Sequence, residues 1–174
     1  NKVKKKLRKG LPTFGSWVMI GELAAAEIMA EAGFDWITVD MEHTSITYES
    51  LPVLVSAIQS KAVDAFVRIE ENSPVVIKRV LDCGAGGIIV PLVNSREEAL
   101  AAVKAARYPP EGVRGVSLGR ASGYGNNFKD YFESINGQVL VLAQIEHYLA
   151  VEKIEEIVSV DGLDGVFLGP YDLS

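Results

Sequence analysis

Two apolar segments of the sequence end on carboxylate residues, which suggests one shared site. Residues 139–145 are apolar apart from Gln144 and are followed by Glu146, and residues 165–171 lead to Asp172. Continuous apolar runs of this kind are typical of strands buried on both faces of a parallel sheet. If both strands run parallel in one sheet, Glu146 and Asp172 emerge at the same edge. Neighbouring carboxylates repel each other unless a positive charge lies between them, and a divalent cation is the simplest such charge.

The alternative for each carboxylate alone is that it caps a helix or pairs with a lysine. Two carboxylates at equivalent strand ends, with Gln144 close to one of them in the sequence, favour a metal site instead. Both ligands would be hard oxygens, and so few ligands leave coordination positions open for water and substrate. These properties favour Mg²⁺ or Mn²⁺ over structural zinc.

An arginine, Arg68, lies near the end of a third apolar segment, residues 65–69. Burying a guanidinium is costly unless it meets an anion. The partner inside the protein would be Asp40 or Glu42, and the functional partner would be a carboxylate or enolate oxygen of a substrate. These two roles are compatible. Trp17, at the end of the first predicted strand, either walls the same pocket or packs in the core.

A histidine, His43, lies in an acidic loop that follows a predicted strand, where a general base is plausible. The carboxylate that orients it could be Asp40, Glu42 or Asp82. The second histidine, His147, directly follows Glu146, and we assign it a supporting or structural role.

The sequence lacks the patterns that are typical of several other classes of enzyme. No predicted strand ends on a lysine, as a Schiff-base enzyme would require, and there is no Gly-x-Ser-x-Gly elbow or phosphate-binding loop. The single cysteine, Cys83, excludes an internal disulfide and fits a reducing cytosol.

The composition predicts a soluble globular protein. The 174 residues are 48% hydrophobic and carry a net charge of −6, which argues against a nucleic-acid surface. The basic residues 2–9 are interpreted as a solvated terminal helix. No apolar run is long enough to span a membrane, and no signal peptide is recognisable, so we expect a cytoplasmic protein.

The order of elements predicts an α/β protein with repeated strand–helix units. Such repeats form either a doubly wound sheet or a (β/α) barrel. The barrel is favoured because no Gly-x-Gly-x-x-Gly turn follows the first strand, and because polar groups end several strands, where barrel active sites lie. Six of eight strands are present, which predicts one barrel domain over residues 1–174, incomplete at its C-terminal end. The predicted strands cover residues 13–19, 35–40, 65–69, 87–92, 139–146 and from 165 onward. The predicted helices cover residues 22–32, 48–60, 73–84, 95–107, 128–134 and 148–158.

Six motifs, in order, resemble the HpcH/HpaI aldolase family, and the resemblance extends from about residue 7 to residue 174. The motifs are Asp40-Met41-Glu42-His43, Val67-Arg68-Ile69, Val90-Pro91-Leu92-Val93-Asn94, residues 107–115 (Arg-Tyr-Pro-Pro-Glu-Gly-Val-Arg-Gly), Gln144-Ile145-Glu146 and residues 169–174 (Gly-Pro-Tyr-Asp-Leu-Ser). The resemblance implies a (β/α)8 TIM barrel of the phosphoenolpyruvate/pyruvate type and a class II pyruvate aldolase. It also implies a homo-oligomer, either a trimer or a hexamer.

The resemblance further implies roles for individual residues. Glu146 and Asp172 would bind a divalent cation, Mg²⁺, Mn²⁺ or Co²⁺, and Arg68 would stabilise the pyruvate enolate. The remaining implied roles are His43 as the base, Asp82 or Asp40 as its support, Gln144 as a contact of metal-bound water or substrate, Trp17 as a wall of the site, and the Gly169, Pro170 and Tyr171 backbone as the contact of the pyruvate carboxylate.

The sequence departs from the family pattern at three points. Tyr171 stands where the family often has Ala, and Glu70 where it often has Pro. Family chains are also about half as long again, and the additional part supplies the last two strands and a terminal helix exchanged between subunits.

The expected reaction is the reversible cleavage of a 4-hydroxy-2-oxo acid to pyruvate and an aldehyde. Two alternatives remain at this point. One is a lyase that acts on a coenzyme A thioester, like the related citrate-lyase β subunits. The other is a non-catalytic barrel fragment or subunit.

Overall fold

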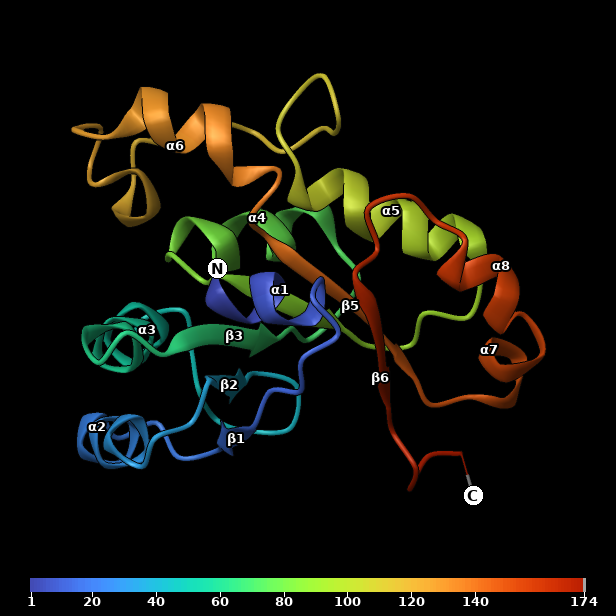
Figure 1. The fold of residues 1–174 in the computed structure, drawn as a ribbon, viewed down its shortest axis with the longest axis horizontal. Helices are drawn as coiled ribbons and strands as arrows, with labels where there is room; N and C mark the ends of the chain where they lie inside the picture. The colour runs from blue at the N-terminus through green and yellow to red at the C-terminus, as the bar shows by residue number, and fades with distance from the viewer. Residues whose placement is uncertain (174) are drawn as a thin grey trace.

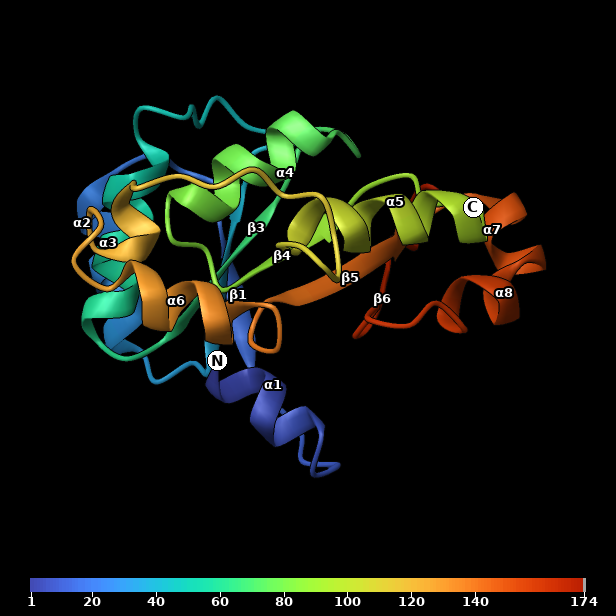
Figure 2. The same cartoon turned by 90° about the horizontal axis from the view of Figure 1, so that it is seen from above.

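The computed structural model describes residues 1–173 as a curled, six-stranded parallel sheet with helices along its outer side (Figures 1 and 2). The strands follow one another in the sheet in the order of the sequence, so the prediction of an α/β, barrel-like fold with six strands is confirmed. The strands are β1 (Gly15–Val18), β2 (Trp36–Asp40), β3 (Asp64–Arg68), β4 (Gly87–Val90), β5 (Leu140–Ile145) and β6 (Gly165–Leu168). The helices are α1 (Lys2–Leu7), α2 (Leu23–Glu31), α3 (Leu51–Ser60), α4 (Pro74–Asp82), α5 (Arg96–Ala106), the 3-10 turn η1 (Arg120–Ser122), α6 (Phe128–Ile135), α7 (Tyr148–Glu152) and α8 (Ile154–Val158).

The sheet curls far enough for its first and last strands to touch through their side chains. The Trp17 ring of β1 and the Phe167 ring of β6 lie 5.3 Å apart between centroids, although four strands separate them in the sheet. The strands β2 to β5 place fully buried aliphatic side chains against the helices, among them Ile37, Val67 and Val141. The result is a half-barrel whose carboxyl strand ends lie along one rim.

The structure corrects several predicted boundaries. Helix α3 begins at Leu51 and not at residue 48, and Lys153 divides the helix predicted over residues 148–158 into α7 and α8. Strand β6 was expected to be buried on both faces, but it is only half-buried because no strand follows it in the described part of the sheet. The capping interaction predicted at Ser95 is present, since its side chain accepts a hydrogen bond from the Glu98 N–H.

The prediction of a solvated N-terminal helix is wrong for one face of α1. Val3 and Lys4 are buried, and Lys4 Nζ donates hydrogen bonds to the Val139 carbonyl (2.6 Å) and to Asp164 (2.9 Å). The Val3 N–H donates to Asp64 at 2.7 Å. Burial lowers the pKa of Lys4 below its ordinary value, against the opposing effect of Asp164. These partners all lie near the amino ends of strands, so α1 closes the amino end of the half-barrel.

None of the helices within residues 1–173 combines the length and the apolar character that crossing a membrane requires.

We expect Lys4→Ala to destabilise the fold by about 3 kcal/mol, because it leaves the carboxylate of Asp164 without its buried cationic partner. Urea unfolding followed by circular dichroism measures the difference. The matched control is Lys5→Ala, which removes an exposed lysine of the same helix and should change stability by less than about 0.5 kcal/mol. Equal losses in both variants would show that the pairing of Lys4 does not anchor α1.

Candidate active site at the carboxyl strand ends

The centre of the rim is a buried ion pair between neighbouring strands. Asp40 ends β2 and Arg68 ends β3, and the two residues are register partners in the sheet. Arg68 donates from Nε to Asp40 Oδ1 (2.9 Å) and from Nη2 to Oδ2 (2.6 Å), a two-pronged geometry that fixes the guanidinium plane. The Asp40 side chain is fully buried and that of Arg68 is 14% exposed. The Arg68 guanidinium is therefore held in a fixed orientation at the rim.

The ion pair sets the protonation of both groups. Burial alone would raise the pKa of Asp40, but the hydrogen bonds and the charge of Arg68 outweigh it, and the pKa lies below its ordinary value. Burial would likewise lower the pKa of Arg68, but Asp40 and Glu42 raise it. Both groups are therefore charged at neutral pH.

A second carboxylate, Glu42, joins this pair to the rest of the site. Glu42 Oε2 lies 3.3 Å from Arg68 Nε, 3.5 Å from His43 Nε2 and 3.5 Å from Gln144 Nε2. Burial raises the pKa of Glu42, and the neighbouring Glu146 adds to the increase, whereas Arg68 and His43 oppose it. The sequence alone indicates Glu42 only as one of several possible partners for Arg68 or His43. Its position between them comes from the turn after β2, where the Glu42 and His43 N–H groups both donate to Asp40 Oδ1.

Glu146 follows β5 and is held through both carboxylate oxygens. Oε1 accepts the backbone N–H of Leu92 at 2.7 Å, and Oε2 accepts Nε2 of Gln144. Gly169 lies directly against it, since a Cβ at that position would be 2.9 Å from the Glu146 Cβ and 3.4 Å from Oε2. The turn after β6 therefore needs glycine to approach Glu146 this closely.

Glu146 and Asp172 line the same cavity, of about 370 Å³, together with Glu42, His43, Leu92 and His147. In residues 1–173 no group of three or more histidine, cysteine or acidic side chains is arranged to hold a metal, so a metal site built from these residues would have few protein ligands. Gln144 Oε1 is buried without a hydrogen-bond partner. Two hard carboxylates and an unpaired amide oxygen nearby suit a small oxygen-seeking cation that keeps open positions.

The other residues that the sequence predicts for the site lie in different parts of the structure. The Arg68 guanidinium lies 4.8 Å above the ring of Trp17, so Trp17 both contacts the site and packs against Phe167. Pro170 and Tyr171 are exposed in the turn after β6. Ser174, the last residue of the family motif, is outside the described residues.

Asp82 is not brought to His43 within the described part of this chain. It ends α4, and the end of that helix leads into the amino end of β4, at the opposite edge of the sheet. There Asp82 Oδ1 accepts a hydrogen bond from Arg114 Nη2 at 2.7 Å. The carboxylates that contact the His43 loop in this structure are Asp40 and Glu42.

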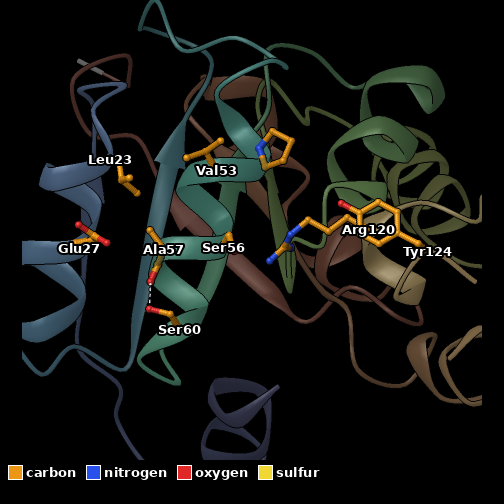
Figure 3. A pocket seen from close by; sticks show the side chains of 9 residues that line it. Leu23, Glu27, Val53, Ser56, Ala57, Ser60, Arg120 and Tyr124 are labelled. Atoms are coloured by element: carbon orange, nitrogen blue, oxygen red, sulfur yellow. Dashed lines mark hydrogen bonds between the residues drawn. The ribbon is translucent and has the colours of Figure 1, made fainter. Parts of the chain in front are cut away.

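A second cavity, of about 490 Å³, lies between helices α2 and α3 and the loop that contains η1. Figure 3 shows Arg120 extending from that loop toward α3. Its guanidinium is already bonded to the Cys83 carbonyl and to Gln59. This cavity is larger than the one at the strand ends, but it contains none of the clustered polar strand-end groups, so we assign the chemistry to the rim.

We expect Asp40→Asn to lower the free energy of unfolding by about 3 kcal/mol at pH 7, because Arg68 loses its buried counter-charge. The advantage of the parent protein should be fully present above the ordinary Asp pKa of 3.8. It should disappear as the pH falls through the lower pKa of the folded state, since Asp40 is then protonated. Denaturant unfolding from pH 7 to pH 2 measures this, with the exposed Asp161→Asn as control. A difference that does not depend on pH would contradict the assignment.

We expect Gly169→Ala to displace the Glu146 carboxylate, because the added methyl group would lie 2.9 Å from its Cβ. Binding of Mn²⁺, measured by isothermal titration, should weaken at least tenfold. Gly137→Ala is the matched control, since its added carbon meets no atom closer than 3.8 Å. Unchanged Mn²⁺ affinity in Gly169→Ala, with the fold intact, would show that Glu146 does not bind the ion.

Comparisons with known proteins identify the family of the chain. Residues 13–174 match the HpcH/HpaI aldolase/citrate lyase family. The chain is 42% identical to a 4-hydroxy-2-oxo-heptane-1,7-dioate aldolase of Shigella sonnei, over all of this chain and 67% of that protein. It is 41% identical to a hydroxypyruvate/pyruvate aldolase of Roseobacter denitrificans, over all of this chain and 68% of that protein. These relatives support an aldolase function.

A solved structure has the same fold as this chain. An HpcH/HpaI aldolase/citrate lyase family protein from Burkholderia cenocepacia J2315 superimposes with a TM-score of 0.94 at 34% identity, covering 99% of this chain and 70% of that one. The chain thus spans about two thirds of the length of the relatives that it matches. With the family matched over residues 13–174 and the fold shared with a solved member, the chain belongs to the HpcH/HpaI aldolase/citrate lyase family.

Proposed function

We propose that the protein cleaves a 4-hydroxy-2-oxo acid reversibly to pyruvate and an aldehyde. The observation that carries this proposal is the convergence of a fixed guanidinium, a histidine and two carboxylates at one rim of the half-barrel. Carbon–carbon cleavage of such an acid leaves negative charge on the 2-oxo oxygen and requires a proton to leave the 4-hydroxyl group. The rim offers groups for both requirements.

Arg68 would meet this charge, together with a divalent cation when one is bound. Glu146 and Asp172 would hold Mg²⁺, Mn²⁺ or Co²⁺, with the unpaired Oε1 of Gln144 as a contact for bound water or substrate. When bound, the cation would act as a Lewis acid toward the 2-oxo oxygen. Arg68 adds a fixed positive charge that costs no reorientation during the reaction, because Asp40 already holds its guanidinium plane.

The proton is taken by His43 as the general base. Its Nε2 lies 3.5 Å from Glu42 Oε2, which can orient the ring and stabilise the charged imidazolium. Trp17 lines the site beneath Arg68, and the backbone of Gly169, Pro170 and Tyr171 is proposed to receive the pyruvate carboxylate. Within one copy of the chain Asp40 and Glu42, rather than Asp82, are placed to support the base.

We propose a single (β/α) barrel domain, a cytoplasmic location, no nucleic-acid partner and a homo-oligomer, either a trimer or a hexamer. Size-exclusion chromatography with light scattering tests the oligomeric state.

We expect Glu146→Gln to reduce kcat for pyruvate release at least 100-fold, because the amide removes a charge from the cation site while keeping its shape. Release of pyruvate from a panel of 2-keto-3-deoxy acids, coupled to lactate dehydrogenase, provides the measurement. The control is Glu152→Gln, on the exposed side of α7. Full activity of Glu146→Gln would contradict the proposed role of this residue.

We expect a chelator to abolish pyruvate release, and added Mg²⁺, Mn²⁺ or Co²⁺ to restore it. A parallel assay with a coenzyme A thioester separates the aldolase from a citrate-lyase-like enzyme. Chelator-resistant cleavage, or turnover of the thioester alone, would overturn the proposal.

A further inference from the structure

The guanidinium of Arg68 has one nitrogen that forms no hydrogen bond within the described part of the chain. Nε and Nη2 both donate to Asp40, whereas none of residues 1–173 accepts a hydrogen bond from Nη1. The Arg68 side chain is 14% exposed, and Nη1 retains access to solvent. This nitrogen is therefore the one that an oxygen of a substrate can reach, and its direction depends on what holds the guanidinium in place.

Trp17 covers one flat face of this guanidinium. Arg68 Cζ lies 4.8 Å from the centroid of the Trp17 ring, which is within the range of a cation–π interaction. Asp40 holds the guanidinium by the edge that carries Nε and Nη2, and Trp17 supports one of its faces. Together, the two contacts leave Nη1 little freedom to move.

Trp17 is itself held from the other side of the half-barrel. The ring of Phe167, in β6, lies 5.3 Å from the Trp17 ring between centroids, at an interplanar angle of 53°. Phe167 is the register partner of Gln144, whose side chain donates to Glu146. Because register partners in a sheet share a face, the Phe167 ring lies on the face that carries the charged groups of the rim. The aromatic pair thus spans the site from β1 to β6.

We propose that Trp17 is a positioning residue for the reaction: Phe167 holds the Trp17 ring, and the ring holds Arg68 with Nη1 directed at the oxygen on which the enolate charge develops. The inference rests on the proposed aldolase function and adds how its fixed cation is kept in place. A positioned charge stabilises the transition state without reorientation, whereas a guanidinium that is free to tilt must be ordered in each turnover. Trp17 therefore acts on enolate formation and not on binding of the aldehyde.

The test separates enolate formation from the rest of the reaction. Exchange of the C3 protons of pyruvate with deuterated solvent, followed by NMR, requires the enolate but no aldehyde. Pyruvate release from a 2-keto-3-deoxy acid gives kcat and KM for the complete cleavage. The variants are Trp17→Leu, which removes the ring, Trp17→Phe, which keeps a flat ring, and Phe167→Leu, which removes the support of Trp17.

We expect Trp17→Leu to lower kcat and the exchange rate by the same factor, about tenfold, and to change KM by less than about threefold. Trp17→Phe should retain at least about a third of both rates, because it keeps a ring face for the guanidinium. Phe167→Leu should lower both rates about threefold, and the double variant should lose no more than Trp17→Leu, since Phe167 acts through Trp17.

Trp36→Leu is the matched control. Trp36 also packs against a phenylalanine, Phe66, with ring centroids 6.0 Å apart, but it does so at the amino end of β2. Loss of the Trp36 ring should destabilise the fold without changing kcat or the exchange rate. Equal losses of rate in Trp17→Leu and Trp36→Leu would show a general effect of a missing aromatic ring and would overturn the role of Trp17.

The outcomes separate the two proposals. Absence of both pyruvate release and proton exchange in the parent protein would overturn the aldolase function, and this inference with it. In an active parent protein, an exchange rate that survives Trp17→Leu, or an effect on KM alone, would overturn only the positioning role. If circular dichroism shows that Trp17→Leu does not fold, Phe167→Leu decides in its place, and unchanged rates in that variant would overturn the inference.

Discussion

The site depends on the ion pair between Asp40 and Arg68. A guanidinium at the end of an apolar strand is stable only because a buried carboxylate on the next strand meets it with two hydrogen bonds. The carboxylate of Asp40 is fully paired in this interaction. The guanidinium of Arg68 also interacts electrostatically with a second carboxylate, that of Glu42. The carboxylates of Glu42, Glu146 and Asp172 then exceed the fixed positive charge around their cavity. That excess is the physical reason for expecting a bound cation.

The parallel arrangement of the strands brings these charged side chains together in one site. Asp40, Arg68 and Glu146 lie at or just beyond the ends of neighbouring or nearby strands, so one rim collects them without any long loop. The opposite rim of the half-barrel has a different role. There α1 fills the amino end through Lys4 and Val3, and the buried contacts serve stability. The contacts of α1 at the amino ends thus serve the fold alone, whereas the Asp40–Arg68 pair at the carboxyl ends serves both the fold and the proposed chemistry.

The sequence was sufficient to predict the strands and the acidic rim. An apolar run marks a buried strand, and the charged residue at its end, Asp40, Arg68 or Glu146, marks the carboxyl end of that strand. It was not sufficient for features that depend on tertiary contacts. The burial of Lys4 could not be distinguished from a solvated basic helix, since its partners Val139 and Asp164 are more than 130 residues away. The positions of Glu42 and Leu92 depend on turn conformations, which a residue pattern does not encode.

The stacking around Trp17 has a practical consequence. Its indole contacts both the Arg68 guanidinium and the Phe167 ring, whereas the other tryptophan, Trp36, lies beside Phe66 at the amino end of β2. The protein therefore carries two intrinsic fluorophores, one at each end of its strands. Emission from Trp17 depends on the electric field around Arg68, and emission from Trp36 depends on the surroundings of the opposite end. Because the two emission bands overlap, replacing either tryptophan with phenylalanine would let a spectroscopist follow one end of this half-barrel at a time without attaching a dye.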